Sequence, residues 1–132
     1  MMDFTTRPVR SSAILTNSYV AGTVIDLSQA SMKFNQLILN CDFTKGSLTS
    51  LKIKIEYSND GTTYRQLATQ GVSSGTITLT PAEFVMICSA LGATQSFVLE
   101  IPIKYRYIKV SFLGVDTVTN SLLAVDAILG EV

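Results

Sequence analysis

The side chains that could do acid–base chemistry in this chain are carboxylates, because none of its 132 residues is a histidine. Without histidine, the commonest general base and the Ser-His and Cys-His dyads are missing. A pair of carboxylates could still hydrolyse a glycosidic bond. The candidates are Asp60, Glu83, Asp116 and Asp126. They share no motif or common spacing, so we expect no catalytic residues and no enzymatic activity.

Metal and cofactor sites have equally little support in the sequence. Asp60 could ligate calcium, but the several alternating oxygen ligands of a calcium loop are missing around it. Cys41 and Cys88 are the two cysteines, and without histidine they cannot complete an ordinary zinc set. We expect Asp60 to bond its own turn and both cysteines to lie reduced in the core, with no metal and no cofactor.

Partner binding is better supported by residue type. Tyr105 and Tyr107 flank Arg106, and a tyrosine-rich face can bind a sugar or a protein. Phe4, Arg7 and Arg10 could grip a neighbouring subunit. The alternatives are ordinary half-buried strand tyrosines and a frayed terminus. The predicted partner interface is Phe4, Arg7, Arg10, Tyr105 and Tyr107.

The charge balance narrows the choice of partner. The chain has 10 basic and 10 acidic residues, which argues against a general nucleic-acid or anionic-membrane binder. Charged residues make up 15% of the chain, against roughly 25% in ordinary soluble domains. We therefore expect partners to cover part of the surface, and we expect a homo-oligomer. No apolar run approaches the roughly 20 residues of a membrane span, and MMDFTTRPVR lacks a secretory signal's apolar segment, so synthesis in a cytoplasm is expected.

The clearest structural element is a hairpin that begins with the strand 51–57. Leu51, Ile53, Ile55 and Tyr57 alternate with charged residues, as in a strand with one buried face. The turn residues Ser58-Asn59-Asp60-Gly61 then reverse the chain, and Gly61 should adopt a positive φ. A return strand is expected over 62–67.

Further alternating segments predict strands over 34–43, 76–80, 96–101, 105–113 and 122–129. Ile77 and Leu79 should point inward, and the segment 71–75 should be a loop. The segment 122–129 is apolar on both faces except for Asp126, so it should be central or covered by a partner. The expected core includes Ile53, Ile55, Leu79, Leu99, Ile108 and Val110.

Residues 81–91 fit two structures. Thr80-Pro81-Ala82-Glu83 resembles a capped helix start, whereas Phe84-Val85-Met86-Ile87-Cys88 is rich in strand formers. We favour a strand that forms a hairpin with residues 96–101. The chain is thus expected to be all-β, an antiparallel β-sandwich or jelly roll with at most one short helix near residues 81–91. Residues 1–20 should be an extended N-terminal arm, ordered mainly by another subunit, and residues 21–132 a single sandwich domain.

Two segments carry a resemblance to a known class of proteins. LKIKIEYSNDGTTYRQL and IPIKYRYIKVSFLG, followed by LLAVDAILGEV, resemble small structural proteins of tailed bacteriophage virions over about residues 35 to 130. The shared pattern is a strand ending in Ser-x-Asp-Gly, a return strand with an aromatic residue, and a later Pro-Ile…Tyr-Arg-Tyr-Ile strand. It comprises Ser58, Asp60, Gly61, Tyr64, Pro102, Tyr105, Arg106, Tyr107 and Ile108.

The same turn and strand are also similar to discoidin-like carbohydrate-binding sandwiches. In those proteins a Trp usually follows the Asp-Gly turn, whereas Tyr64 stands here, and their disulfide is missing.

The first resemblance implies a non-enzymatic virion component, made in the host cytoplasm. Our first choice is a head decoration (cement) protein, which resembles β-sandwich clamps that oligomerise, often as trimers, and bind the major capsid protein. The alternative is a tail or fibre domain, or a carbohydrate-binding module, that recognises host glycans. The sequence leaves open the virion location, the copy number, the host and a bound glycan.

Overall fold

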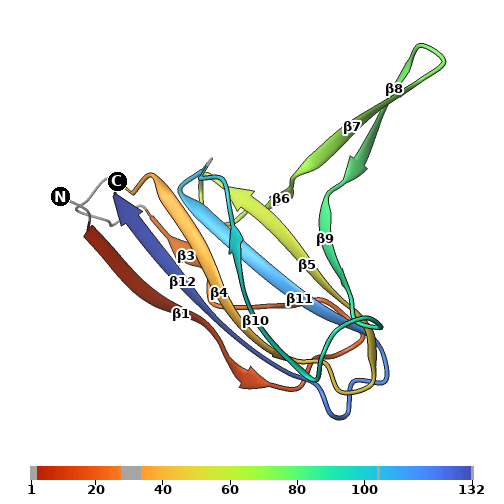
Figure 1. Ribbon diagram of the computed structural model, residues 1–132. Helices are drawn as coiled ribbons and strands as arrows, with labels where there is room; N and C mark the ends of the chain where they lie inside the picture. The colour runs from red at the N-terminus through yellow and green to blue at the C-terminus, as the bar shows by residue number, and fades with distance from the viewer. Residues whose placement is uncertain (1–2, 28–33, 104, 132) are drawn as a thin grey trace.

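The computed structural model describes residues 3–27, 34–103 and 105–131, and it is an all-β sandwich without a helix in these residues (Figure 1). A four-stranded antiparallel sheet has the order β1 (Asp3–Ala13), β12 (Leu122–Glu131), β4 (Gln36–Thr44), β10 (Thr94–Glu100). The second sheet contains β2 (Val20–Ala21), β3 (Ile25–Asp26), β11 (Tyr107–Asp116), β5 (Leu48–Ser58), β6 (Arg65–Gln66) and β9 (Glu83–Ile87). The expected all-β antiparallel sandwich is therefore confirmed.

The core lies between the two sheets and follows the predicted alternation on the long strands. Every second residue of β4, β5, β11 and β12 is buried. Of the predicted core residues, Ile53, Ile55, Ile108 and Val110 are at most 3% exposed. Leu99 is half-buried and packs against this core. β12 is a central strand of its sheet, as one of the two expectations for residues 122–129 had it. Leu123, Val125, Ala127 and Leu129 face the core, whereas Leu122 and Asp126 on the outer face are exposed.

The predicted turn after β5 is built by its own side chains. The Ser58 hydroxyl donates to Asp60 Oδ1 over 2.8 Å, and Asp60 Oδ1 also accepts the backbone N–H groups of Thr62 and Thr63. Gly61 has φ +77°, as expected for this turn. A Cβ at Gly61 would meet the Tyr107 ring at 3.3 Å. The return strand is shorter than expected, because only Arg65 and Gln66 pair with β5.

The N-terminal segment differs from the expected arm. Residues 3–13 form β1, which pairs antiparallel with β12 from Asp3↔Glu131 to Ala13↔Leu123. Val9 is buried at 3% exposure, so the segment contributes to the core as well as to the ladder. Backbone pairing with β12 joins this segment to the sandwich, and its ordering by another subunit stays a prediction. The sequence pattern hid the strand because two register shifts, between Pro8 and Arg10 and between Arg10 and Ala13, interrupt the alternation.

The structure settles residues 81–91 in favour of the strand. β9 covers Glu83–Ile87, but it pairs with β5, from Ser50↔Ile87 to Lys54↔Glu83. The expected hairpin between this strand and residues 96–101 is wrong, because β10 pairs with β4 in the other sheet.

β6 and β9 lie one after the other along the same edge of β5. Leu67 N–H donates to Ile55 O over 3.5 Å, directly after the β6 pairs, and Glu83 lies opposite Lys54. Residues 68–82 leave this edge as an excursion that holds the hairpin of β7 (Ala68–Ser73) and β8 (Thr76–Pro81). Ala82 N–H donates to Leu67 O over 2.7 Å and closes its base. Figure 1 shows the hairpin projecting away from the sandwich.

Two predictions about this excursion are wrong. The expected loop over 71–75 is part of the hairpin, and its turn is confined to Ser74 and Gly75, with φ values of 51° and 77°. Ile77 and Leu79 do not point into the core, since their side chains are 66% and 69% exposed. Alternation along a strand shows which side chains share a face, but it does not show that a second sheet covers that face.

Candidate interaction surfaces

The projecting hairpin (residues 68–82) has two chemically different faces. The register pairs Val72 with Ile77 and Gln70 with Leu79, so these four side chains share one face. The opposite face carries hydroxyl groups: Thr69, Ser73, Thr76, Thr78 and Thr80. Val72, Ile77 and Leu79 are 75%, 66% and 69% exposed, which is unusual for large aliphatic side chains.

Charge is absent from this part of the chain. No Asp, Glu, Lys or Arg occurs between Arg65 and Glu83. Natural proteins commonly protect exposed strands with charged side chains or proline. Pro81 at the base is the one such residue in the hairpin. An uncharged strand pair with an exposed apolar face is typical of a surface that a partner covers.

A second apolar surface lies where the sandwich is open. β9 and β10 are edge strands of different sheets, and a groove of about 330 Å³ lies between them. We call it the edge groove. Its lining is uncharged: Leu51, Ile53, Phe84, Val85, Met86, Phe97, Val98 and Leu99. Phe84 is 42% exposed, so the groove is accessible in the isolated chain.

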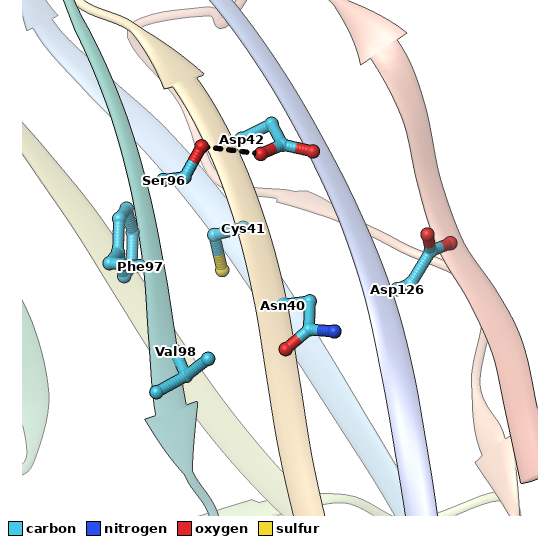
Figure 2. Close-up of a pocket in the computed structure, with 7 residues that line it drawn as sticks. All are labelled: Asn40, Cys41, Asp42, Ser96, Phe97, Val98 and Asp126. Carbon is cyan, nitrogen blue, oxygen red and sulfur yellow. Dashed lines mark hydrogen bonds between the residues drawn. The ribbon is translucent and has the colours of Figure 1, made fainter.

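A third surface, the polar face, lies on the outer side of β10, β4 and β12 (Figure 2). Asn40 lies opposite both Val98 and Asp126, and Asp42 lies opposite Ser96. Ser96 Oγ donates to Asp42 Oδ1 over 2.8 Å. The open hollow here has a volume of about 510 Å³. Its amide, hydroxyl and carboxylate groups could bond the hydroxyls of a sugar, but the aromatic residue nearby, Phe97, packs against the core.

The two arginines of the predicted interface form hydrogen bonds with backbone carbonyls of their own chain. Arg7 donates to Asp26 O over 2.5 Å, and its guanidinium lies 6.0 Å from the Phe34 ring centroid. Arg10 donates to the carbonyls of Leu123, Ala13 and Ile14. Phe4 is 53% exposed and covers Gly130, where an added Cβ would meet the Phe4 ring at 2.6 Å. These bonds and contacts hold β1 on the sandwich, and a role of the three residues in partner binding stays a prediction.

Tyr105 and Tyr107, the tyrosines of the predicted interface, both lie near the turn after β5. Tyr107 begins β11, pairs with Ser58 and lies beside Gly61. Tyr105 precedes that strand, is 45% exposed, and its ring centroid lies 5.5 Å from that of Tyr57. A small hollow of about 160 Å³ lies there, lined by Tyr57, Ser58, Asn59, Arg65, Gln66 and Tyr105. A binding role of Tyr105 and Tyr107 also stays a prediction.

The structure places the candidate carboxylates apart. Asp60 is bound into its turn, and Asp116, at the end of β11, accepts the Thr49 hydroxyl. Glu83 accepts the Tyr19 hydroxyl and pairs with Lys52 over 3.4 Å. Asp126 lies on the polar face of the other sheet.

Cys41 and Cys88 are free and buried, and burial raises the pKa of the Cys41 thiol to about 12. In the described residues, no three Cys, Asp or Glu side chains are grouped so that they could hold a metal ion. That same part of the chain contains no helix long and apolar enough to cross a membrane.

Sequence reasoning missed the projecting hairpin and the edge groove as surfaces. The available signal was the uncharged run from Gln66 to Ala82, with a Ser-Gly turn between two alternating segments. The groove has no local signal, because its two walls, β9 and β10, belong to different sheets.

Comparison with known proteins does not assign the chain to a family. No family model matches the chain, and no curated protein matches it. The crystal structure of the SPBc2 prophage-derived protein YomS is similar, with a TM-score of 0.48 and 17% sequence identity. The similarity covers 99% of this chain and 96% of that chain.

Proposed function

We propose that the protein is a non-enzymatic structural protein of a bacteriophage virion. Within the virion, the role we propose is capsid decoration: the protein oligomerises and binds the capsid surface through the major capsid protein. The projecting hairpin is the observation that carries this proposal. Its apolar face exposes Val72, Ile77 and Leu79 to water, and a permanent partner would remove that surface from water.

Three features of the chain support an assembled, non-catalytic role. The sequence resembles tailed-phage virion proteins from the strand before the Ser58 turn to β12. The candidate carboxylates are dispersed, and Asp60, Glu83 and Asp116 are bonded in local structure. The low charge of the chain, 15%, fits a protein whose surface is covered in an assembly.

The test is mass spectrometry and electron microscopy of purified particles made by the phage that encodes the chain. Several hundred copies per particle, located on the head, are expected for decoration. A handful of copies would assign the protein to the tail, and its absence from purified particles would rule out the virion role.

The polar face favours a second candidate, a tail or fibre domain or a carbohydrate-binding module that recognises host glycans. Asn40 and Asp126 make no side-chain hydrogen bond with any described residue and are exposed, so their polar groups are available to sugar hydroxyls. Binding to host-cell glycans that is lost in Asp126→Ala would support this candidate. Unchanged binding in that variant would place any glycan elsewhere.

A further inference from the structure

The projecting hairpin and the edge groove are two exposed apolar surfaces on one chain, and neither covers the other. The base of the hairpin is fixed by Ala82 N–H donating to Leu67 O and by Gln66 Nε2 donating to Ala82 O over 2.8 Å. The hairpin leaves the sandwich from there (Figure 1). Ile77 and Leu79 on the hairpin and Phe84 at the groove are all exposed in the same structure.

The two surfaces match in length. Residues two apart on a strand face lie about 7 Å apart, which is the spacing of Ile77 and Leu79. The groove is bordered by three consecutive residues on each wall, Phe84–Met86 on β9 and Phe97–Leu99 on β10, so it is also about 7 Å long. A pair of aliphatic side chains from one hairpin strand therefore fits the space between the walls.

The two surfaces also match in charge and in shape. The hairpin carries no charged residue, and neither does the groove lining, so apolar docking would bury no charge and leave none unpaired. One surface projects and the other is hollow. A contact between two hairpins or between two grooves would lack this complementarity.

We propose that the hairpin of one copy seats Ile77 and Leu79 in the edge groove of a second copy. The inference rests on the proposed assembling role and names the partner as the chain itself. The contact is heterologous, because two different surfaces of the subunit meet. An open chain of copies keeps one free hairpin at one end and one free groove at the other, so it closes into a ring or grows as a filament. The occupied groove would also cover the open edges of β9 and β10.

The test uses charged variants of exposed residues in the full chain. Ile77→Asp places a carboxylate on the apolar face, and Phe84→Asp places one at the groove. Thr78→Asp is the matched control, because it adds the same charge to the adjacent residue on the hydroxyl face. In analytical ultracentrifugation we expect oligomers for the wild type and for Thr78→Asp, and monomers for the other two. Melting curves check that each variant is folded.

Cross-linking then distinguishes a hairpin-to-groove contact from other contacts. The double variant Leu79→Cys/Phe84→Cys should form a ladder of disulfide-linked multimers under oxidation, in which mass spectrometry finds position 79 of one copy joined to position 84 of the next. Each single variant should stop at dimers. Cys41 and Cys88 are buried and should not react. A wild type that stays monomeric, a Phe84→Asp protein that assembles normally, or a double variant without disulfides between positions 79 and 84 would each overturn the inference.

These outcomes are separate from those of the virion test. A monomeric protein found on particles would refute self-docking and leave the virion role standing. A cross-linked ladder from a protein absent from particles would do the reverse.

Discussion

Leu67 and Glu83 lie next to each other along β5, opposite Ile55 and Lys54, although residues 68–82 separate them in the sequence. Their side chains also continue the alternation of one edge strand. Joining them directly would therefore keep the register and the pleat of β6 and β9 against β5.

Removing residues 68–82 should leave the sandwich folded. In this stretch Ala82 alone is half-buried, and the other residues are exposed, so the deletion takes little from the core. We expect a cooperative melting curve within a few degrees of the wild type. If the hairpin docks as proposed, the same protein should sediment as a monomer. A deletion variant that fails to fold would show that the hairpin helps to stabilise the sandwich.

Truncation to alanine should lower the stability strongly at one isoleucine and hardly at all at another. Ile55 is 3% exposed in the core, and Ile55→Ala should lower the free energy of unfolding by about 2–5 kcal/mol. Ile77 is 66% exposed on the hairpin, and Ile77→Ala should change it by less than about 0.5 kcal/mol in the monomer. Chemical denaturation of both variants measures the difference. Equal losses would contradict the assigned positions.

The turn after β5 should depend on glycine at one position. Gly61 combines φ +77° with the nearby Tyr107 ring, so Gly61→Val adds backbone strain and a steric contact. Thr62 is exposed, and Thr62→Val should be tolerated. We expect Gly61→Val to lower the melting temperature more. Similar melting temperatures for the two variants would exclude this account of the turn.

Asp60 should make the stability of this turn depend on pH. Hydrogen bonds from the backbone of Thr63 and Thr62 and from the Ser58 hydroxyl lower the Asp60 pKa from 3.8 to about 2. A lower pKa in the folded state means that the ionised carboxylate favours folding. That contribution is present above the ordinary pKa of 3.8 and is lost as the pH falls through about 2.

Melting temperatures of the wild type and of Asp60→Asn test this expectation between pH 6 and pH 2. The wild type should melt at the higher temperature above pH 4, and the difference should shrink toward pH 2. A difference that stays constant over this range would show that the charge of Asp60 is not involved.

Deleting residues 1–10 should destabilise the sandwich itself. β1 supplies the outer ladder for β12, the buried Val9, and the Arg10 hydrogen bond to Leu123 O. We expect a clearly lower melting temperature for the truncated chain even as a monomer. A truncated protein that melts like the full chain would show that β1 adds little to the stability of the sandwich, as expected of an arm ordered mainly by another subunit.

Local patterns predicted what depends on alternation and turn chemistry. Ile53, Ile55, Ile108 and Val110 are buried, and Gly61 has a positive φ, because each is fixed by its neighbours along the chain. Leu79 alternates equally well and is exposed, because burial also requires a facing sheet. The pairing of β9 with β5 rather than β10 depends on contacts between distant segments, which periodicity does not encode.

The candidate surfaces were less predictable than the fold for the same reason. The tyrosines and arginines of the predicted interface were chosen by residue type. In the structure, Arg7 and Arg10 donate hydrogen bonds to backbone carbonyls of the same chain. The edge groove exists because β9 and β10 end two different sheets on the same side. Neither strand carries a residue pattern that indicates it.

The pairing of β1 with β12 has a consequence for the order of folding. β1 cannot pair with β12 until the ribosome has released β12, so the four-stranded sheet cannot close before the strands between them have been made. Long-range pairing of this kind also slows folding. Until then β1 is an unpaired strand in the nascent chain, and its Arg7, Pro8 and Arg10 are the residue types that discourage premature edge-to-edge association.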